Sequence, residues 1–115
     1  MSDDCLFCRI AAGEIPTDVV ARGDDWVAFR DIHPQAPTHV LIVPHRHVAS
    51  IDDLHADDAP LAGTLIAVAA EVAREEGLVE RGYRLVFNVG EGAGQSVHHI
   101  HLHLLGGRGF SWPPG

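Results

Sequence analysis

One short segment near the end of the chain, residues 99–105, constrains the fold more than any other. It alternates histidine with aliphatic residues in the order His-Ile-His-Leu-His-Leu-Leu. Because successive side chains of a β-strand point to opposite faces, the pattern predicts a strand over 97–105 with His99, His101 and His103 on one face. The aliphatic residues between them then form an apolar face that can pack against a helix.

The other periodic segments predict an α+β fold. Further strands are expected at 19–21, 26–32, 38–44 and 83–89. A long helix is expected over 61–76, because apolar residues recur at helical spacing between the acidic, proline-containing start at 57–60 and Gly77. A short N-terminal helix is expected over 7–12. Short turns between consecutive strands indicate a five-stranded antiparallel sheet with the long helix on one face.

Length and composition limit the class of protein. The 115 residues suffice for one compact domain, 1–115, in which residues from about 106 to 115 form a C-terminal tail. The net charge is −8, with 16 acidic against 8 basic residues. Nucleic-acid binding needs clustered lysine and arginine, so a nucleic-acid partner is not expected, although a few local donors can still hold one small anion.

The N-terminal residues and the two cysteines indicate a compartment. The chain starts without a basic, apolar signal-peptide pattern, and no apolar run reaches the roughly 20 residues of a membrane helix. We therefore expect a cytoplasmic protein without a membrane partner. In that reducing compartment Cys5 and Cys8 are expected as thiols or metal ligands and not as a disulfide.

The histidine strand has three possible interpretations. It could be an ordinary polar sheet face. It could bind a metal, but His99 and His103 would be about 13 Å apart on a straight strand, and zinc–nitrogen bonds of about 2 Å cannot collect all three imidazoles. The interpretation we favour is nucleophilic catalysis by His101, since imidazole has a pKa of about 6.5 and can attack phosphorus to form a phosphoramidate.

The loop before this strand, residues 88–96, supports phosphate chemistry. It contains three glycines between Gly90 and Gly94, followed by Gln95 and Ser96. Glycines permit close approach, and successive backbone amides can form an anion-binding nest. Glycine-rich loops are also common in hairpins, so the argument depends on the adjacent histidines.

At this point a family resemblance can be stated. Residues 99–105 match the histidine-triad signature, in which histidine alternates with apolar residues. The flanking segments 94–97 and 105–108, the segment 31–44 and the ending Trp-Pro-Pro-Gly resemble the Hint-like branch of the histidine-triad (HIT) family, which is similar to purine nucleoside phosphoramidases. The resemblance implies a homodimer with a continuous sheet. It also implies hydrolysis at the α-phosphate of purine nucleoside phosphoramidates, of the AMP-amine type, through a nucleotidyl-histidine intermediate.

The resemblance further implies a role for individual residues. His101 would be the nucleophile, and the catalytic residues around it would be His39, His99 and His103. The nucleotide-binding residues would be Asp31 at the ribose, Ile32 and Phe29 at the base, and Asn88, Gly94, Gln95, Ser96, His101 and His103. Trp112 would join them through a tail that reaches toward the site of the partner subunit. From the residues alone, Asp31 could instead be a turn acid, His39 a buried histidine with satisfied hydrogen bonds, and Phe29 and Ile32 ordinary core.

A zinc site is a separate expectation. Two thiolates and two imidazoles make a complete structural zinc set. Some bacterial histidine-triad proteins have an arrangement that resembles Cys5, Cys8, His47 and His99 in this chain. The alternative is a pair of small semi-buried thiols. Zinc would be structural, no cofactor would be needed for the chemistry, and a zinc-bound His99 would orient its neighbours instead of exchanging protons.

Other functions remain open at the level of sequence. Within enzymes, the alternatives are a dinucleoside polyphosphate hydrolase or a nucleotidyl transferase, and the Trp-Pro-Pro-Gly ending favours the phosphoramidase. Outside enzymes, the alternative is a nucleotide-binding interaction module. In each case the expected partner is a small purine nucleotide, together with a second copy of the chain.

Overall fold

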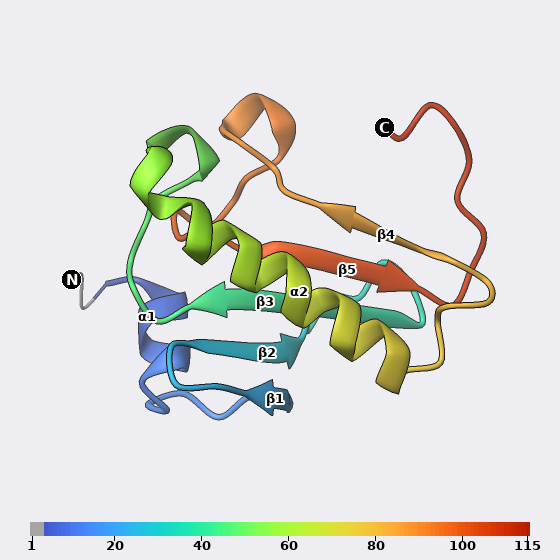
Figure 1. The fold of residues 1–115 in the computed structure, drawn as a ribbon, viewed down its shortest axis with the longest axis horizontal. Helices are drawn as coiled ribbons and strands as arrows, with labels where there is room; N and C mark the ends of the chain where they lie inside the picture. The colour runs from blue at the N-terminus through green and yellow to red at the C-terminus, as the bar shows by residue number, and fades with distance from the viewer. Residues whose placement is uncertain (1–3) are drawn as a thin grey trace.

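A five-stranded antiparallel sheet with the order β1-β2-β3-β5-β4 is the centre of the computed structural model, which describes residues 4–115 (Figure 1). The strands are β1 (Val19–Arg22), β2 (Trp26–Arg30), β3 (Thr38–Pro44), β4 (Tyr83–Val86) and β5 (Leu102–Gly106). Every neighbouring pair is antiparallel. The last strand lies between β3 and β4, so the histidine segment enters the middle of the sheet.

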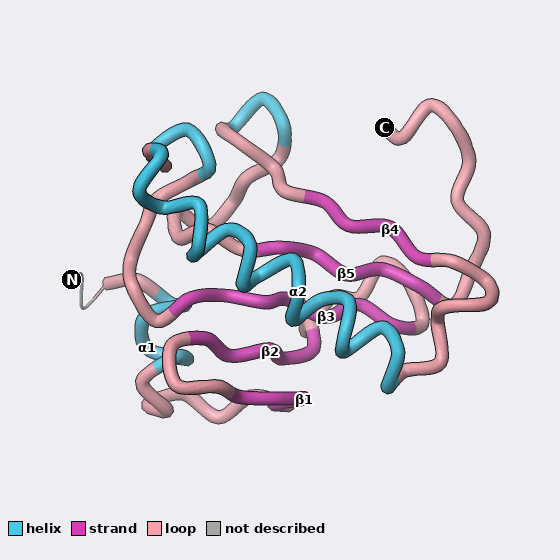
Figure 2. The backbone as a smooth tube through the Cα atoms, viewed as in Figure 1, coloured by secondary structure: helices cyan, strands magenta, loops and turns pink. Residues whose placement is uncertain are grey.

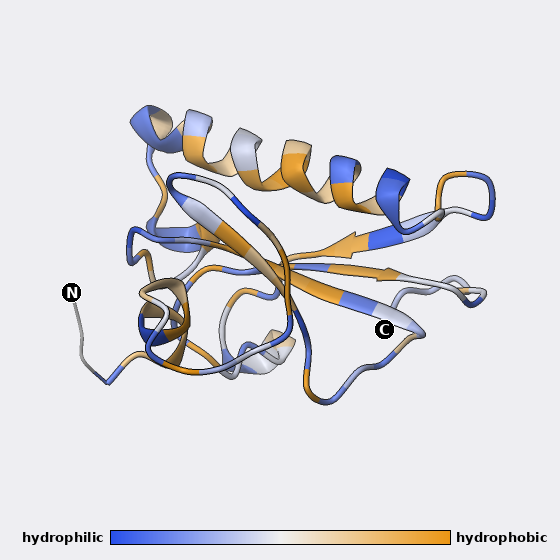
Figure 3. Cartoon of the chain, turned by 90° about the horizontal axis from the view of Figure 1, so that it is seen from below, coloured by the Kyte–Doolittle hydropathy of each residue, from blue (hydrophilic) through white to orange (hydrophobic). Residues whose placement is uncertain are grey.

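Two helices cover opposite faces of this sheet. The long helix α2 (Ala59–Glu75) lies along one face, and the short helix α1 (Leu6–Ala11) packs on the other (Figures 1 and 2). The apolar side of α2 faces the sheet (Figure 3). The helix ends before Gly77, whose φ of +72° is a left-handed angle that glycine adopts without strain. The predicted α+β fold is thus confirmed.

The strand residues alternate between two apolar clusters. Ala28, together with Ile42 on β3, joins the cluster under α2, whereas Val27 and Phe29 join the cluster against α1. Leu104 continues the α2 side on β5 and is fully buried. Burial of a side chain of this size contributes roughly 1.5–3 kcal/mol, so both faces stabilise the sheet. No helix within residues 4–115 is long and apolar enough to cross a membrane.

Three strand predictions were too long. The strand expected over 97–105 begins only at Leu102, because its pairing with β3 stops at Ile42, and the preceding backbone turns away. There the Ile100 N–H donates to the Val48 carbonyl. The strands expected over 26–32 and 83–89 likewise end early, at Arg30 and Val86.

The sequence patterns also gave no sign of three short 3-10 helices in the connections. These helices are η1 (Ile51–Asp53), η2 (Ala56–Asp58) and η3 (Glu91–Ala93). The last of them lies inside the segment that the sequence predicted only as a glycine-rich loop.

Candidate active site

A cavity of about 310 Å³ lies on the α1 face of the sheet and is lined by half of the predicted catalytic and nucleotide-binding residues. The predicted residues that line it are Phe29, Asp31, Ile32, Ser96, His101 and His103. Its apolar walls also include Phe7 and Ile10 from α1, which sequence reasoning assigned only to a short helix. The rings of Phe7 and His101 pack edge to face, with 5.0 Å between their centroids. The local sequence pattern does not predict this contact.

The protonation of His101 follows from its hydrogen bond. Its Nδ1 lies 2.7 Å from the His99 carbonyl oxygen, which can only accept, so Nδ1 carries the proton and Nε2 carries the lone pair. Burial lowers the pKa of His101 below its usual value, against the opposing effects of this hydrogen bond and of Asp31. A neutral imidazole with a free Nε2 is the form that can act as a nucleophile.

A chain of hydrogen bonds fixes the proton on His103 as well. The Gln35 backbone N–H donates to His39 Nδ1 at 3.0 Å, so His39 carries its proton on Nε2. That Nε2–H lies 2.9 Å from His103 Nδ1 and donates to it. The proton of His103 is therefore on Nε2, a buried atom without a hydrogen-bond partner among the residues described. An unpartnered donor at a cavity wall is suited to a ligand oxygen or nitrogen.

Burial keeps both of these histidines neutral. It lowers the pKa of His39, although the Asp31 carboxylate opposes that shift. It lowers the pKa of His103 to about 4, and repulsion from His101 and His39 contributes in the same direction. At neutral pH the chain of donors from Gln35 to His103 is therefore built from uncharged rings.

Asp31 is held beside these histidines by the turn that follows β2. Its backbone N–H donates to the His39 carbonyl at 3.0 Å. Its carboxylate accepts from the His33 backbone N–H at 2.8 Å, and its other oxygen lies 3.6 Å from His39 Nε2. The structure thus brings Asp31, His39 and His103 together, and we call them the carboxylate cluster. Carboxylate oxygens accept several hydrogen bonds, so Asp31 retains capacity for hydroxyl groups.

A second cavity of about 260 Å³ adjoins the first and shares His103 with it. His39 and Asn88, two more of the predicted residues, line this second cavity and not the first. His103 therefore stands between two spaces, one with the apolar walls and one with His39 and Asn88.

Three predicted residues lie away from both cavities. Gln95 is buried, accepting from the Gly90 N–H and donating to the Ala49 carbonyl at 2.7 Å, so its amide holds the glycine-rich loop in place. Gly94 ends the short helix of that loop with a φ of +89°. Trp112 is 83% exposed. The nucleotide-binding roles of Gln95 and Trp112 stay predictions. The Gln95 amide bonds to Gly90, Ala49 and Val97, and the tail that carries the exposed Trp112 is expected to reach the site of the partner subunit.

His99 lines neither cavity and lies at the predicted metal site. It is fully buried, and its Nε2–H donates to the Pro44 carbonyl at 2.8 Å. Its Nδ1 therefore carries a lone pair, and this atom faces Cys5, Cys8 and His47. We call these four residues the thiol cluster. The cysteines are not joined in a disulfide.

The spacing of the thiol cluster suits a tetrahedral metal ion. His99 Nδ1 lies 3.2 Å from His47 Nδ1, 3.3 Å from Cys5 Sγ and 3.5 Å from Cys8 Sγ. A tetrahedron with zinc–nitrogen bonds of about 2.0 Å and zinc–sulfur bonds of about 2.3 Å has edges of about 3.3 to 3.6 Å between these atom types. A ligating histidine commonly donates its other N–H to a carbonyl, as His99 does to Pro44.

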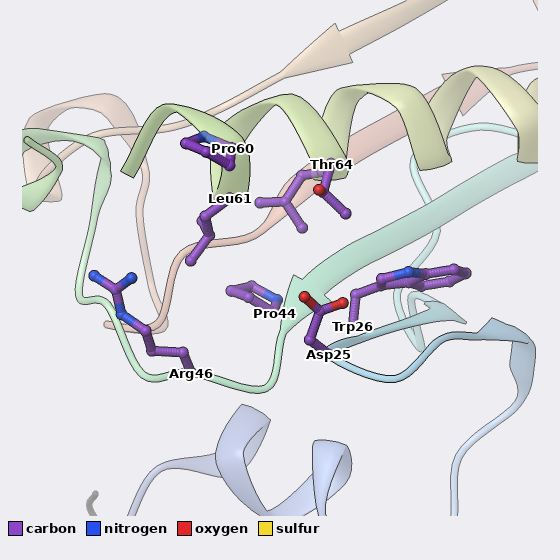
Figure 4. Close-up of a pocket in the computed structure, with 8 residues that line it drawn as sticks. Asp25, Trp26, Pro44, Arg46, Pro60, Leu61 and Thr64 are labelled. Atoms are coloured by element: carbon purple, nitrogen blue, oxygen red, sulfur yellow. The ribbon is translucent and has the colours of Figure 1, made fainter. Parts of the chain in front are cut away.

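Another cavity, of about 330 Å³, lies between α2 and the ends of β2 and β3 (Figure 4). Trp26, Pro44, Pro60 and Leu61 supply much of its wall, and Arg46 lies at its edge. No histidine lines this cavity. The predicted catalytic histidines and metal ligands therefore lie on the α1 face of the sheet and at its margin.

Comparisons with known proteins agree with this geometry. Residues 12–110 match the family model of the HIT domain. The chain is 47% identical over 108 residues to the purine nucleoside phosphoramidase of Escherichia coli K12, an alignment that covers 94% of this chain and 91% of that protein. It is 46% identical over 115 residues to an uncharacterised HIT-like protein of Synechococcus elongatus, covering 100% of both chains.

Solved structures show the same similarity. A HIT family hydrolase from Legionella pneumophila Philadelphia 1 superposes with a TM-score of 0.96 at 58% identity, covering 97% of this chain and 100% of that chain. A histidine triad protein from Clostridium difficile superposes with a TM-score of 0.93 at 37% identity, covering 96% of both chains.

Proposed function

The chain belongs to the HIT domain family, and from this premise we propose that it hydrolyses purine nucleoside phosphoramidates at the α-phosphate through a nucleotidyl-histidine intermediate. One observation carries the proposal: His101, with an imidazole lone pair, and His103, whose Nε2–H has no partner within residues 4–115, line the same cavity. Their ring centroids are 5.0 Å apart, so both can reach groups on one phosphorus atom. The similarity to the Escherichia coli enzyme supports the choice of substrate.

The reaction has two steps. His101 Nε2 attacks the α-phosphorus, the bond from phosphorus to the amine nitrogen breaks, and the departing amine takes the Nε2 proton of His103. A water molecule then gives a proton back to His103 while its oxygen bonds to phosphorus, and the bond to His101 breaks. The products are AMP and the free amine, and each step uses only imidazole and water.

The remaining cavity residues would bind the nucleoside. The apolar wall of Phe7, Ile10 and Phe29 suits a flat purine base, with Ile32 at its edge. Asp31 lies where it could accept hydrogen bonds from the two ribose hydroxyls, which a carboxylate can do with both oxygens. Ser96 lines the same cavity and would donate to a phosphate oxygen.

The decisive experiment is intact mass spectrometry of the protein during turnover of an adenosine phosphoramidate. The sample should be quenched in base, because a phosphoramidate bond survives base better than acid. We expect an added mass of one adenylyl group on the wild type and none on His101→Gly. Turnover without an adduct, if chelators abolish it, would reject the nucleophile and favour a metal-dependent hydrolase.

The proposal also includes a structural zinc ion in the thiol cluster. The donor set of two thiols and two imidazoles, its spacing and the Pro44 hydrogen bond to His99 all fit zinc. Zinc there would fix α1, which follows its N-cap Cys5 and carries Phe7 into the wall of the first cavity, the proposed base cavity. Metal analysis of the purified protein should find about one zinc per chain, and a Cys8→Ser variant should lose it.

Two further parts of the proposal concern assembly and location. β4 is an edge strand, and strand edges with unpaired backbone groups readily pair with another chain, so a homodimer with a continuous sheet is proposed. Sedimentation equilibrium should then give twice the chain mass. Two thiols that form no disulfide suit a reducing compartment, so a cytoplasmic location is proposed.

A further inference from the structure

The second cavity, on the far side of His103 from the base cavity, is lined by two arginines that take no part in the proposed reaction. Arg84 projects from β4 and Arg108 follows β5, and both line this cavity with His39, Asn88 and His103. His103 is the residue proposed to protonate the departing amine. The leaving group must therefore lie against His103, and the second cavity is the space into which its far end can extend.

The two arginines keep most of their hydrogen-bonding capacity. A guanidinium group has five N–H donors. Arg84 uses one on the Ser111 carbonyl, and Arg108 uses two on the carbonyls of Gln35 and Gly109. All of these acceptors are neutral backbone oxygens, so the charges are oriented without being neutralised.

The ion pairs of the described residues lie elsewhere. Arg9, Arg30 and Arg46 pair with carboxylates, whereas neither Arg84 nor Arg108 does. Among the described residues Arg22, Arg74 and Arg81 likewise have no ion pair, so what distinguishes Arg84 and Arg108 is that they line one cavity together in a chain of net charge −8. They create a local positive field at the edge of a negatively charged protein.

An aromatic ring holds the two positive groups near each other. The guanidinium carbons of Arg84 and Arg108 lie 5.1 Å and 4.3 Å from the ring centroid of Phe110, which also lines the cavity. Cation–π contact stabilises each guanidinium while leaving its edge donors available. Two like charges on one ring repel each other, and a bound anion would relieve that repulsion.

We infer that the second cavity binds the leaving group and selects amines that carry an anionic substituent, a carboxylate or a phosphate, through Arg84 and Arg108. The inference rests on the proposed function and specifies its substrate class. Arginine forms charge-assisted, bidentate hydrogen bonds with both kinds of anion, so the two sources share one recognition chemistry.

The test compares three adenosine phosphoramidates that differ only at the end of the amine. One carries β-alanine, with a carboxylate. The second carries O-phosphoethanolamine, with a phosphate, and the third carries β-alanine amide, which is neutral. We expect the wild-type kcat/KM to be at least about tenfold higher for one or both anionic substrates than for the neutral one. The better anionic substrate identifies which source the cavity prefers.

The ratio of anionic to neutral kcat/KM is the readout, because a general loss of activity cancels from it. Arg84→Gln and Arg108→Gln should each bring the ratio toward one, and Arg108→Lys should retain most of it. Arg22→Gln, on β1 at the opposite edge of the sheet, makes the same change of charge and should leave the ratio unaltered. The preference should also shrink at about 0.5 M salt, since these charges are partly exposed.

Two results would overturn the inference: a wild-type ratio near one, or the same loss in Arg22→Gln as in the cavity variants. Failure of the proposed function has a different signature, namely that the wild type hydrolyses none of the three compounds. In that case the dissociation constants of the intact compounds are measured with His101→Asn. Tighter binding of the anionic compounds, lost in the double variant with Arg108→Gln, would support the anion subsite, and equal binding would reject it.

Discussion

His99 in the thiol cluster and His103 in the carboxylate cluster are the outer histidines of the segment 99–105. Their surroundings give the two side chains opposite roles. His99 donates its Nε2–H to Pro44 and directs Nδ1 at two thiols. His103 accepts at Nδ1 from His39 and leaves its Nε2–H at a cavity wall. Soft thiols favour zinc, whereas an open imidazole donor favours a substrate. The difference teaches that the ring nitrogen in use is set by the backbone and side-chain partners.

The largest expected effect falls on the residue between the clusters. Replacing His101 with asparagine should lower kcat for an adenosine phosphoramidate by at least about 10⁴-fold, because the covalent route is lost. Stopped assays of AMP release measure this. His98→Asn changes an exposed neighbour in the same segment and should keep wild-type kcat. A loss of less than about tenfold in His101→Asn would mean that the chemistry belongs to one of the clusters.

The next prediction tests whether the thiol cluster stabilises the folded protein. Cys8→Ser should lose zinc and be less stable by about 4 kcal/mol, at zinc concentrations a thousandfold above the dissociation constant. The midpoint of thermal unfolding should fall by about 10–20 °C.

A chelator provides the control for this comparison. It should lower the midpoint of the wild type to that of Cys8→Ser and leave the variant unchanged. If the chelator leaves the wild type unaffected, the cluster does not hold a structural metal ion, and the contrast between the two clusters is lost.

A smaller effect tests whether the carboxylate cluster serves the reaction. His39→Leu removes the Nε2–H that fixes the proton of His103, so kcat should fall by about 100-fold, within the range of general acid catalysis. The unfolding midpoint should change far less than in Cys8→Ser. His33→Leu, at an exposed histidine in the turn before β3, should behave as wild type. A larger change in stability than in kcat would assign His39 to the core instead.

The smallest effect is a pH dependence of stability. His103 has its pKa lowered from 6.5 to about 4, so in the folded protein it stays neutral where the unfolded chain takes up a proton. Unfolding therefore binds protons, and stability should fall as the pH decreases from about 6.5 to about 4. Urea unfolding at several pH values should show a shallower slope for His103→Asn than for the wild type. Identical slopes would mean that burial does not lower the pKa of His103.

Much of the fold could be predicted because it depends on local patterns. The strand predicted over 26–32 is observed over residues 26–30, where Val27 and Phe29 face α1 and Ala28 faces α2. The strand at 38–44 was predicted with its observed limits, since nearly every residue is apolar or β-branched. Strand ends were less accurate, because pairing with a neighbour, and not the local pattern, decides where β5 begins.

The site was only partly predictable. The histidine spacing indicated a chemical role for His101, and the cysteine pair indicated a metal site before any geometry was available. The contribution of α1 to the base cavity was missed, since Phe7 reaches His101 only through the packing of distant segments. Gln95 and Trp112 line neither cavity within the single chain, and their nucleotide-binding roles stay predictions.

The sequence alone therefore determined which residue types are present, which faces they share along a strand and where the chain must turn, because these follow from side-chain alternation, capping and glycine angles. Only the tertiary structure decided the protonation and partners of the histidines. The Pro44 and His99 carbonyls and the Gln35 amide orient three imidazoles through contacts between separate segments. Hydrogen bonds of this kind depend on where the backbone lies in space, which no periodicity encodes.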